Sequence, residues 1–526
     1  METPVDSTET ARSLALEFGL PFQSDVADES LDPALVRGIP VEWARSHGLL
    51  PVRIGGVLCL LTADPASVEK HQDIALLVGS ELSPVVAPRK VILRCIERCY
   101  FSRRESTEDF LRDLDRETEG DLKSDEVRSD DLLKTSDDAP VTQLVNLILL
   151  EAVKSRASDI HFEPFQSRLR VRYRVDGVLY EQASPPKHME RALVSRIKVM
   201  AHLDIAEKRL PQDGMARVRV GEREIDIRVS SVPVAEGERV VLRLLNRDSS
   251  VMTLGELGMP STMFHSFDAL LHEANGLVIV CGPTGSGKTT TLYAAIRQLD
   301  TKGRNVMTIE DPVEYQLPDI GQMQVKPKIG LTFARSLRHI LRQDPDVVLV
   351  GETRDNETAE IAVRASLTGH LVFTTLHTND AAGAVVRMMD MAVEPYLLAS
   401  ALRGVLAQRL VRRLCPTCRR PVMISARELS VLGVAGKRLE GVTLYEPVGC
   451  PSCLGGYRGR LGIYELLVVD SEVEAIIRGG SSEARALQTL SGRNFRRTLL
   501  EDGIEKVLAG ETSLAEILYA LGISGA

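Results

Sequence analysis

Residues 277–290, LVIVCGPTGSGKTT, constrain the fold more than any other part of the chain. The apolar run 277–281 is too short for a helix, and it fits a parallel strand that is buried on both faces. The residues after it match the pattern G-x-x-x-x-G-K-[ST] at every fixed position. A strand, a tight anion-binding turn and the start of a helix are therefore predicted in direct succession.

This turn has the composition of a phosphate cradle. Its glycines let backbone N–H groups point at the phosphates, and the helix that starts near Lys288 adds the positive end of its dipole. Lys288 is expected to reach the β- and γ-phosphates of ATP, and Thr289 is expected to hold Mg²⁺. The predicted nucleotide-binding residues are Gly282, Pro283, Thr284, Gly285, Ser286, Gly287, Lys288, Thr289 and Thr290.

The formal charge of −9 is confined to one segment. Residues 105–138 hold 14 acidic and 5 basic side chains, which leaves 59 of each sign for the rest of the chain. A neutral remainder argues against a nucleic-acid motor, because phosphate backbones are bound by concentrated basic surfaces. We therefore expect no nucleic acid among the partners, and residues 104–139 are predicted to form a flexible acidic linker.

The length of 526 residues and the hydrophobic content of 44% predict several globular domains. No apolar run approaches the roughly 18 residues that span a bilayer. The acidic and polar N-terminus, METPVDSTET, excludes a secretory signal. These features predict a cytoplasmic protein, one that is able to sit against a membrane.

Residues 1–103 are predicted to form a binding module, because they have a core pattern but no catalytic motif. Cys95 and Cys99 recur with apolar residues at helical spacing, so they are expected in the core rather than at a metal. The expected elements are helices at 33–37, 41–47 and 89–100 and a strand at 56–61.

Residues 140–248 are predicted to form an α+β module. Pro140 suits the first turn of a helix. Arginines alternate with apolar residues over 168–175, which places the arginines on one face of a strand. That face is either an ordinary solvated surface or one that meets nucleotide or a neighbouring subunit. The further expected elements are a helix at 190–202, a hairpin at 217–232 that turns at Gly221 and Glu222, and a strand at 240–245.

Three apolar strands after the phosphate loop end in polar residues, namely Glu310 with Asp311, Glu352, and His377. Ligands of a doubly wound sheet bind at the carboxyl ends of its strands, so these residues are expected beside the loop. Glu352 is predicted to orient and deprotonate the attacking water. Glu310 is the second candidate for the base and, with Asp311, an expected outer partner of Mg²⁺. His377 is expected to sense the γ-phosphate.

Phosphoryl transfer also needs positive charge on the γ-phosphate. Residues 277–377 offer Lys288 for this purpose, but no arginine beside the loop is evident in their sequence. Arg228 and Arg239 belong to a module without an active site of its own. They are therefore predicted to complete the nucleotide site of the same subunit or of the next one.

Four cysteines form two C-x-x-C pairs, CPTC and CPSC. In a reducing compartment this arrangement predicts a tetrahedral zinc site rather than disulfides, although the separation exceeds the usual 15 to 20 residues. Unmetallated thiols are the alternative. The expected zinc ligands are Cys415, Cys418, Cys450 and Cys453. After Arg460 the pattern is helical.

With these motifs in place, the sequence resembles the secretion ATPase superfamily, and closely the assembly ATPase of type II secretion systems, the GspE type. The likeness covers nearly the whole chain, from IPVEWARSHGLLPV and SDIHFEP through GPTGSGKTT and TIEDPVEY to TGHLVFTTLHTND and GYRGRLGIYELL. Glu310, Glu352 and His377 fall in segments that look like the family's Asp box, Walker B and His box.

The resemblance implies a homo-hexamer at the cytoplasmic face of the bacterial inner membrane, which uses ATP to drive pseudopilus assembly. It also implies that residues 1–103 dock on the cytoplasmic domain of the membrane partner called the L component, and that the inner-membrane platform protein is a second partner.

Met215 departs from the family pattern, because a basic residue is expected after QDG. Arg217, Arg228, Arg239 and Arg243 remain the candidate phosphate-facing arginines.

Three rival functions share parts of this pattern. The type IV pilus assembly ATPase shares every catalytic motif. A nucleic-acid translocase would share the core, and a scaffold that binds ATP without turnover is disfavoured by the intact Lys288, Thr289 and Glu352.

The expected fold is α/β, with a RecA-like P-loop ATPase core preceded by two smaller α+β domains and carrying a zinc-binding insertion and a helical C-terminus. The expected boundaries are 1–103, 104–139, 140–248, 249–411 for the ATPase core, 412–460 for the zinc subdomain and 461–526 for the C-terminal helices.

Overall fold

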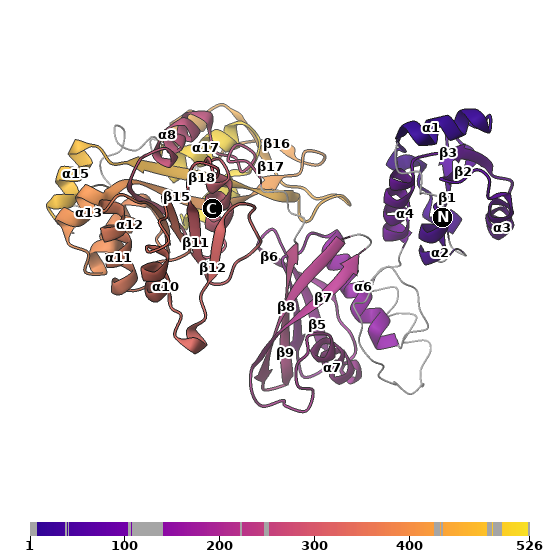
Figure 1. Cartoon of the computed structure of the whole chain (residues 1–526), viewed down its shortest axis with the longest axis horizontal. Coiled ribbons are helices and arrows are strands. Elements are labelled where there is room, and N and C mark those ends of the chain that lie inside the picture. The colour runs from indigo at the N-terminus through magenta and orange to yellow at the C-terminus, as the bar shows by residue number, and fades with distance from the viewer. Residues whose placement is uncertain are drawn as a thin grey trace. The chain divides into compact units, whose positions relative to one another are not determined.

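The computed structural model describes residues 8–36, 39, 41–103, 107, 140–220, 223–246, 252–425, 432, 435–480, 487 and 497–523. The chain divides into two compact units, Met1–Asp248 and Ser249–Ala526 (Figure 1). The predicted acidic linker lies outside the described residues except for Thr107, and so does the predicted turn at Gly221 and Glu222. Within the described ranges, no helix has the length and apolar content needed to cross a membrane.

The first unit begins with a three-stranded sheet and its helices. Strand β1 runs antiparallel to β2, and β2 runs parallel to β3. Strand β1 was not predicted, because Pro51 interrupts its apolar run. Cys95 and Cys99 are fully buried, as predicted. The elements are α1 (Thr8–Glu17), η1 (Asp28–Ser30), η2 (Pro33–Val36), α2 (Val41–His47), β1 (Leu49–Ile54), β2 (Val57–Thr62), α3 (Val68–Val78), β3 (Ser83–Val86) and α4 (Arg89–Arg103).

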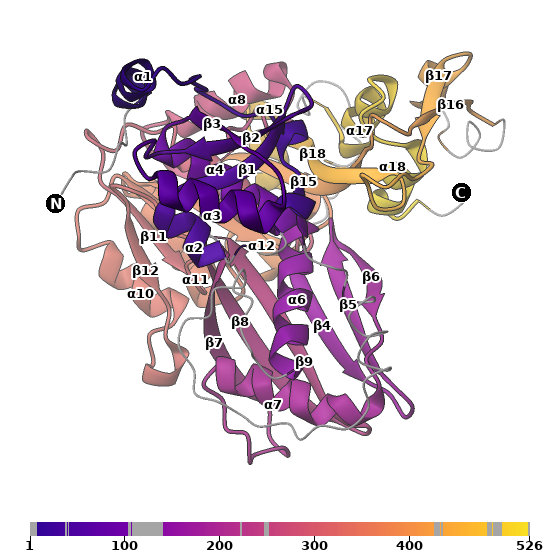
Figure 2. The ribbon, with the colours of Figure 1, turned by 90° about the vertical axis from the view of Figure 1, so that its right-hand side faces the viewer.

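The same unit then forms a six-stranded sheet in the order β6-β5-β4-β9-β8-β7. Residues of β5 alternate between buried and partly exposed, so its arginines share one face as predicted. Helices α6 and α7 lie against the other face (Figure 2), and Tyr173 of β5 donates to the Ile148 carbonyl of α6 at 2.7 Å. The elements are α6 (Pro140–Lys154), β4 (Asp159–Pro164), β5 (Leu169–Val175), β6 (Val178–Ala183), η3 (Lys187–Met189), α7 (Glu190–Met200), β7 (Gln212–Val220), β8 (Arg223–Val234) and β9 (Gly237–Asn246).

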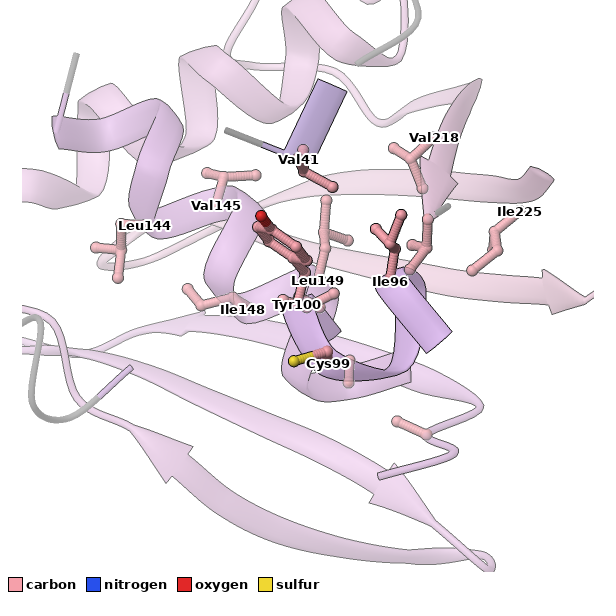
Figure 3. Packing of buried hydrophobic residues seen from close by; sticks show 14 of the residues in the cluster. Val41, Ile96, Cys99, Tyr100, Leu144, Val145, Ile148, Leu149, Val218 and Ile225 are labelled. Carbon is pink, nitrogen blue, oxygen red and sulfur yellow. The ribbon is translucent and has the colours of Figure 1, made fainter. Parts of the chain in front are cut away.

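Helix α6 forms from Pro140 because its apolar residues recur at helical spacing. Leu144, Val145, Ile148 and Leu149 are all buried, and Figure 3 shows them among the packed side chains of this unit. Leu147 and Leu150 are buried as well, so α6 is covered on more than one side.

The second unit is built on a seven-stranded sheet in the order β12-β11-β13-β14-β10-β15-β18. Every neighbouring pair is parallel except β15 with β18, which is antiparallel. The strands are β10 (Gly276–Cys281), β11 (Val306–Glu310), β12 (Gly321–Gln324), β13 (Val347–Val350), β14 (Leu371–Leu376), β15 (Leu402–Leu414) and β18 (Tyr457–Val468).

This sheet is covered on both faces. Leu277 and Ile279 of β10 pack in one cluster of buried residues, while Val278 and Val280 pack in another. The first cluster includes residues of α10 (Phe333–Ile340), α11 (Asn356–Leu367), α12 (Ala381–Asp390) and α13 (Pro395–Ala401), and the second includes residues of α8 (Ser261–Leu271) and α9 (Lys288–Ile296). The apolar run 277–281 therefore predicted its doubly covered strand correctly.

The C-terminal part differs from expectation in one element. Residues 461–468, expected to be helical, belong to the edge strand β18, whose Gly462 allows close contact with Tyr464 and whose hydrogen bonds complete β15. Helices follow only after it. The remaining elements are η4 (Pro327–Ile329), β16 (Arg420–Met423), η5 (Ala435–Leu439), β17 (Thr443–Glu446), α15 (Ser471–Arg478), α17 (Leu499–Leu508) and α18 (Leu514–Leu521).

Candidate active site

The carboxyl ends of four parallel strands meet at one edge of the second sheet. Strand β10 leads into the phosphate loop, and it is hydrogen-bonded to β14, which in turn pairs with β13 and then β11. Glu310 is the last residue of β11, and Glu352 and His377 follow β13 and β14 at the same edge. The parallel topology thus gathers the loop and the three polar strand ends as the sequence indicated.

The loop between β10 and α9 is shaped for close contact. A Cβ atom on Gly282 would lie 2.3 Å from the Gln408 carbonyl oxygen, and Gly287 has φ +87°. No side chain caps the first turn of α9. Among the described residues, the backbone N–H groups of Gly287 and Lys288 donate to no protein acceptor. Free donors at a helix N-terminus suit the binding of an anion.

Lys288 lies within this loop. Its Nζ donates to the carbonyls of Gly282 at 2.8 Å and Pro283 at 3.1 Å. Burial lowers the pKa of Lys288, while the charges of Cys281 and Glu352 act to raise it. The ammonium group is therefore mostly removed from water, where its attraction for a phosphate is strong.

Glu352 is held beside His377 and an arginine. Its Oε2 atom is ion-paired with Arg354, 2.7 Å from Nε, and lies 3.8 Å from His377 Nε2. The backbone around Glu352 is tied to β14, because Thr375 Oγ1 donates to the Gly351 carbonyl at 2.6 Å and Thr353 N donates to the Thr375 carbonyl at 3.0 Å. Glu352 is thus a largely buried carboxylate in a fixed position at the edge of the sheet.

His377 is half-exposed at the end of β14. Burial and the nearby charge of Lys288 lower its pKa, and the Glu352 carboxylate opposes that shift. The imidazole is therefore neutral near pH 7, and a neutral ring is able both to donate and to accept a proton.

Glu310 occupies a different environment. It is 3% exposed, and its two oxygens accept from Tyr293 Oη, from Thr308 Oγ1 at 2.5 Å and from Gln322 Nε2 at 3.1 Å. Three donors fix this carboxylate against α9 and β12. Glu352 is therefore the better placed of the two candidate bases, because it has no such enclosing set of donors.

The predicted arginines belong to the first unit, so their approach to the phosphate loop stays a prediction. Three of the candidates are ion-paired: Arg217 with Asp226 at 2.9 Å, Arg239 with Glu163 at 2.7 Å and Arg243 with Asp159 at 2.9 Å.

Arg228 differs from these three, because it has no hydrogen-bond or ion-pair partner within the described ranges. Together with Arg243 it lines a hollow of about 470 Å³ on the arginine face. Met215, the residue that departs from the family pattern, lines the same hollow. Among the candidates, Arg228 is thus the one whose guanidinium is available to a ligand.

The four predicted zinc ligands are brought together. The Sγ atoms of Cys415, Cys418, Cys450 and Cys453 all lie within 4.8 Å of one another, and three pairs are separated by 3.6 to 3.9 Å. Four sulfurs at the Zn–S distance of about 2.3 Å form a tetrahedron with edges of about 3.8 Å. Backbone N–H groups of Gly449 and Cys450 also donate to two of these sulfurs at 3.3 Å. The residues present fit a tetrahedral metal ion.

Two residues of this region were missed by sequence reasoning. Arg354, beside Glu352, is an arginine within the segment 277–377, so the expectation that this segment offers none near the site was incomplete. The only signal was its position two residues after Glu352. Gln408 of β15 donates to the loop carbonyl of Ser286 at 2.7 Å, and no motif pointed to it.

A parallel sheet, a glycine loop that carries Lys288 and Thr289, and an acidic residue after a neighbouring strand define a P-loop ATPase of the α/β class. Residues 134–519 match the family described as Type II/IV secretion system protein, and residues 18–106 match the MshEN domain. The chain belongs to the Type II/IV secretion system protein family.

Its relatives cover nearly its whole length. The chain is 48% identical to the Type II secretion system protein E of Dickeya dadantii (strain 3937), over 92% of this chain and 97% of that protein. It is 41% identical to the Type IV pilus assembly ATPase PilB of Myxococcus xanthus (strain DK1622), over 98% and 91%. The solved structure of the Legionella pneumophila ATPase DotB has the same fold at a TM-score of 0.55, with 21% identity over 72% of this chain and 95% of that one.

Proposed function

We propose that this protein hydrolyses ATP to ADP and phosphate and that the reaction drives pseudopilus assembly and protein export by a type II secretion system. The observation that carries the proposal is the edge of the sheet where Lys288, Glu352 and His377 meet the anion site of the loop. Each of these groups serves one requirement of phosphoryl transfer, namely charge neutralisation, orientation of water and contact with the γ-phosphate.

In the proposed mechanism, the loop N–H groups and Lys288 bind the phosphates. Thr289 would hold Mg²⁺, which would supply neutralisation of phosphate charge. Glu352 orients the attacking water and accepts its proton. Arg354 limits the movement of the Glu352 carboxylate through their 2.7 Å contact. His377, neutral and half-exposed, donates to the γ-phosphate. Arg228 completes the site between subunits of a homo-hexamer, with Arg239 as the second candidate.

A secretion role is favoured over pilus assembly by the relatives. Type II secretion system protein E from several bacteria is 44–48% identical to this chain, whereas the Myxococcus xanthus pilus ATPase is 41% identical. The difference is small, and both roles use the same catalytic residues. Binding of the cytoplasmic domain of the L component, compared with the matching membrane protein of a pilus system, tests the assignment. Selective binding to the pilus protein would reverse it.

We also propose that the protein works at the cytoplasmic face of the inner membrane, where the L component and the platform protein hold it. The first module supplies a folded core around Ile92, Cys95 and Cys99 but none of the catalytic groups named above. Its exposed apolar side chains include Leu76, which is 80% exposed. Such a surface suits a docking role.

Deletion of residues 1–103 should leave ATP binding unchanged and eliminate recruitment to membranes that contain the L component. The physical reason is that the phosphate loop and its neighbours all belong to residues 249–526. Co-sedimentation with such membranes and calorimetric titration with ATP measure the two effects. Undiminished sedimentation of the shortened protein would contradict the docking role.

We propose zinc as the metal of the four-cysteine cluster. One zinc ion per chain is expected. Chelation should loosen residues 415–453 while the ATP site is retained, because the metal would join the two C-x-x-C pairs at the ends of this segment. Elemental analysis of protein purified under reducing conditions and hydrogen exchange with and without chelator check both effects. Absence of zinc in that protein would contradict the assignment.

DNA-stimulated ATP hydrolysis is the result that would favour a nucleic-acid translocase instead. We expect no stimulation by single- or double-stranded DNA. A rate that rises with added DNA, and loses that rise at high salt, would overturn the proposed substrate class.

A further inference from the structure

Gln408 is a buried polar side chain that the mechanism above does not use. It is 2% exposed and follows Ala407, the residue of β15 that pairs with Cys281 at the end of β10. Gln408 therefore stands alongside Gly282, where the phosphate loop begins. Its neighbours Leu406 and Tyr464 pack in the cluster that includes α9, so its side chain is on the α9 face of the sheet.

The amide group of Gln408 makes one bond to the loop and one to the helix. Its Nε2 donates to the Ser286 carbonyl at 2.7 Å, and its Oε1 accepts from Thr291 Oγ1 at 2.7 Å. The carbonyl of Ser286 only accepts, which fixes the amide orientation. A Cβ on Gly287 would lie 2.9 Å from the same Nε2, so the glycine permits this close approach.

The bond to Ser286 also orients the next N–H group. In a trans peptide the C=O and the N–H point in opposite directions. Holding the Ser286 carbonyl toward Gln408 therefore turns the Gly287 N–H away from β15. That N–H has no acceptor within the described ranges, and it belongs to the N-terminus of α9, where anions bind.

We propose that Gln408 is a positioning residue that holds the Gly287 N–H ready for the nucleotide phosphates. The inference rests on the proposed ATP function. A donor that is already oriented costs no reorganisation when the phosphate arrives, which is the advantage of preorganisation. Gln408 thereby acts on nucleotide affinity through the loop backbone and touches no phosphate itself.

The variant Gln408→Glu separates the two bonds with almost no change of shape. An ionised carboxylate still accepts from Thr291 but is unable to donate to Ser286, whereas a protonated carboxyl group does both. Burial raises the pKa of a carboxyl group, so protonation falls within an accessible pH range. Among the described residues packed on this face, the titratable side chains include Lys288 and Tyr293 of α9, Tyr464 of β18, and His265 and Asp268 of α8. Asp502 and Lys506 of α17 contact Tyr464. Burial raises the pKa of both tyrosines well above that range.

The experiment measures dissociation constants for ADP and ATP by calorimetry from pH 6 to pH 8.5, with wild-type protein as the reference at each pH. Gln408→Glu should bind both nucleotides about tenfold more weakly at high pH, the factor for one hydrogen bond to a charged group, and recover as the pH falls. Gln408→Met, which has no donor, should be weaker at every pH. Wild-type affinity of either variant at all pH values would overturn the proposal.

A matched control removes the bond to the helix and keeps the bond to Ser286. Thr291→Val is expected to lower the melting temperature while nucleotide affinity stays within about twofold of wild type. If Thr291→Val lost as much nucleotide affinity as Gln408→Glu, Gln408 would only link the loop to α9 structurally. That result would also overturn the proposal. Failure of the proposed function has a separate signature, because wild-type protein would then bind ATP no better than Lys288→Ala.

Discussion

Lys288→Ala should abolish both ATP binding and turnover, while Glu352→Gln should keep ATP bound and lower kcat by roughly 10²-fold or more. The two effects differ because Lys288 lies inside the loop, hydrogen-bonded to Gly282 and Pro283, whereas Glu352 is attached to β13 and β14 at the neighbouring strand end. Equilibrium titration with ATP and steady-state phosphate release measure binding and turnover separately.

Exposed residues of the same types provide the controls. Lys302→Ala and Glu360→Gln each remove one charge from the same unit, and neither residue lies at the carboxyl edge of the sheet. Both variants should bind and hydrolyse ATP as the wild type does. Normal hydrolysis by Glu352→Gln together with loss of hydrolysis in Glu310→Gln would assign the base to Glu310 instead.

The environments of the two carboxylates explain why Glu352 is preferred. Glu310 is surrounded by Tyr293, Thr308 and Gln322, which donate to both of its oxygens. Such donors occupy the lone pairs that a water would otherwise use. Glu352 is ion-paired with Arg354, which is 70% exposed, and its contacts with Arg354 and His377 both involve Oε2.

The convergence of the polar strand ends on the phosphate loop was predictable because it follows from local patterns. Each strand of the nucleotide edge is a short apolar run, and each run ends in Glu310, Glu352 or His377. Parallel pairing then brings such ends together without further information. The four cysteines were equally predictable, because two C-x-x-C pairs indicate a set of metal ligands from the sequence alone.

The rest depends on contacts between distant residues. Two of the three donors to Glu310 come from α9 and β12, and no pattern near Glu310 indicates these two. Gln408 lies in a strand whose other polar residues are arginines, so its bond to Ser286 has no signal in the sequence. Strand β18 was expected to be helical after Arg460, because its pairing with β15 is decided by tertiary structure rather than by local spacing.

The site still needs positive charge from outside the second unit, and Arg228 is the strongest candidate. Arg354 is engaged by Glu352, and Arg217, Arg239 and Arg243 are each neutralised by a carboxylate. Arg228 lines the hollow on the arginine face without such a partner in the described part of the chain. An arginine supplied to the γ-phosphate commonly accelerates phosphoryl transfer by about 10³-fold or more.

Arg228→Ala should therefore lower kcat by about 10³-fold while ATP binding is retained through Lys288. Arg191→Ala on α7, the helix against the opposite face of the sheet, is the matched control and should hydrolyse ATP normally.

If the arginine acts between subunits, activity per chain should rise with protein concentration. Mixing Arg228→Ala chains with Lys288→Ala chains should then recover activity that neither has alone, because a mixed assembly contains sites with an intact Lys288 and a neighbouring Arg228. Activity per chain that stays flat on dilution to verified monomers would instead require a site that is complete within one chain.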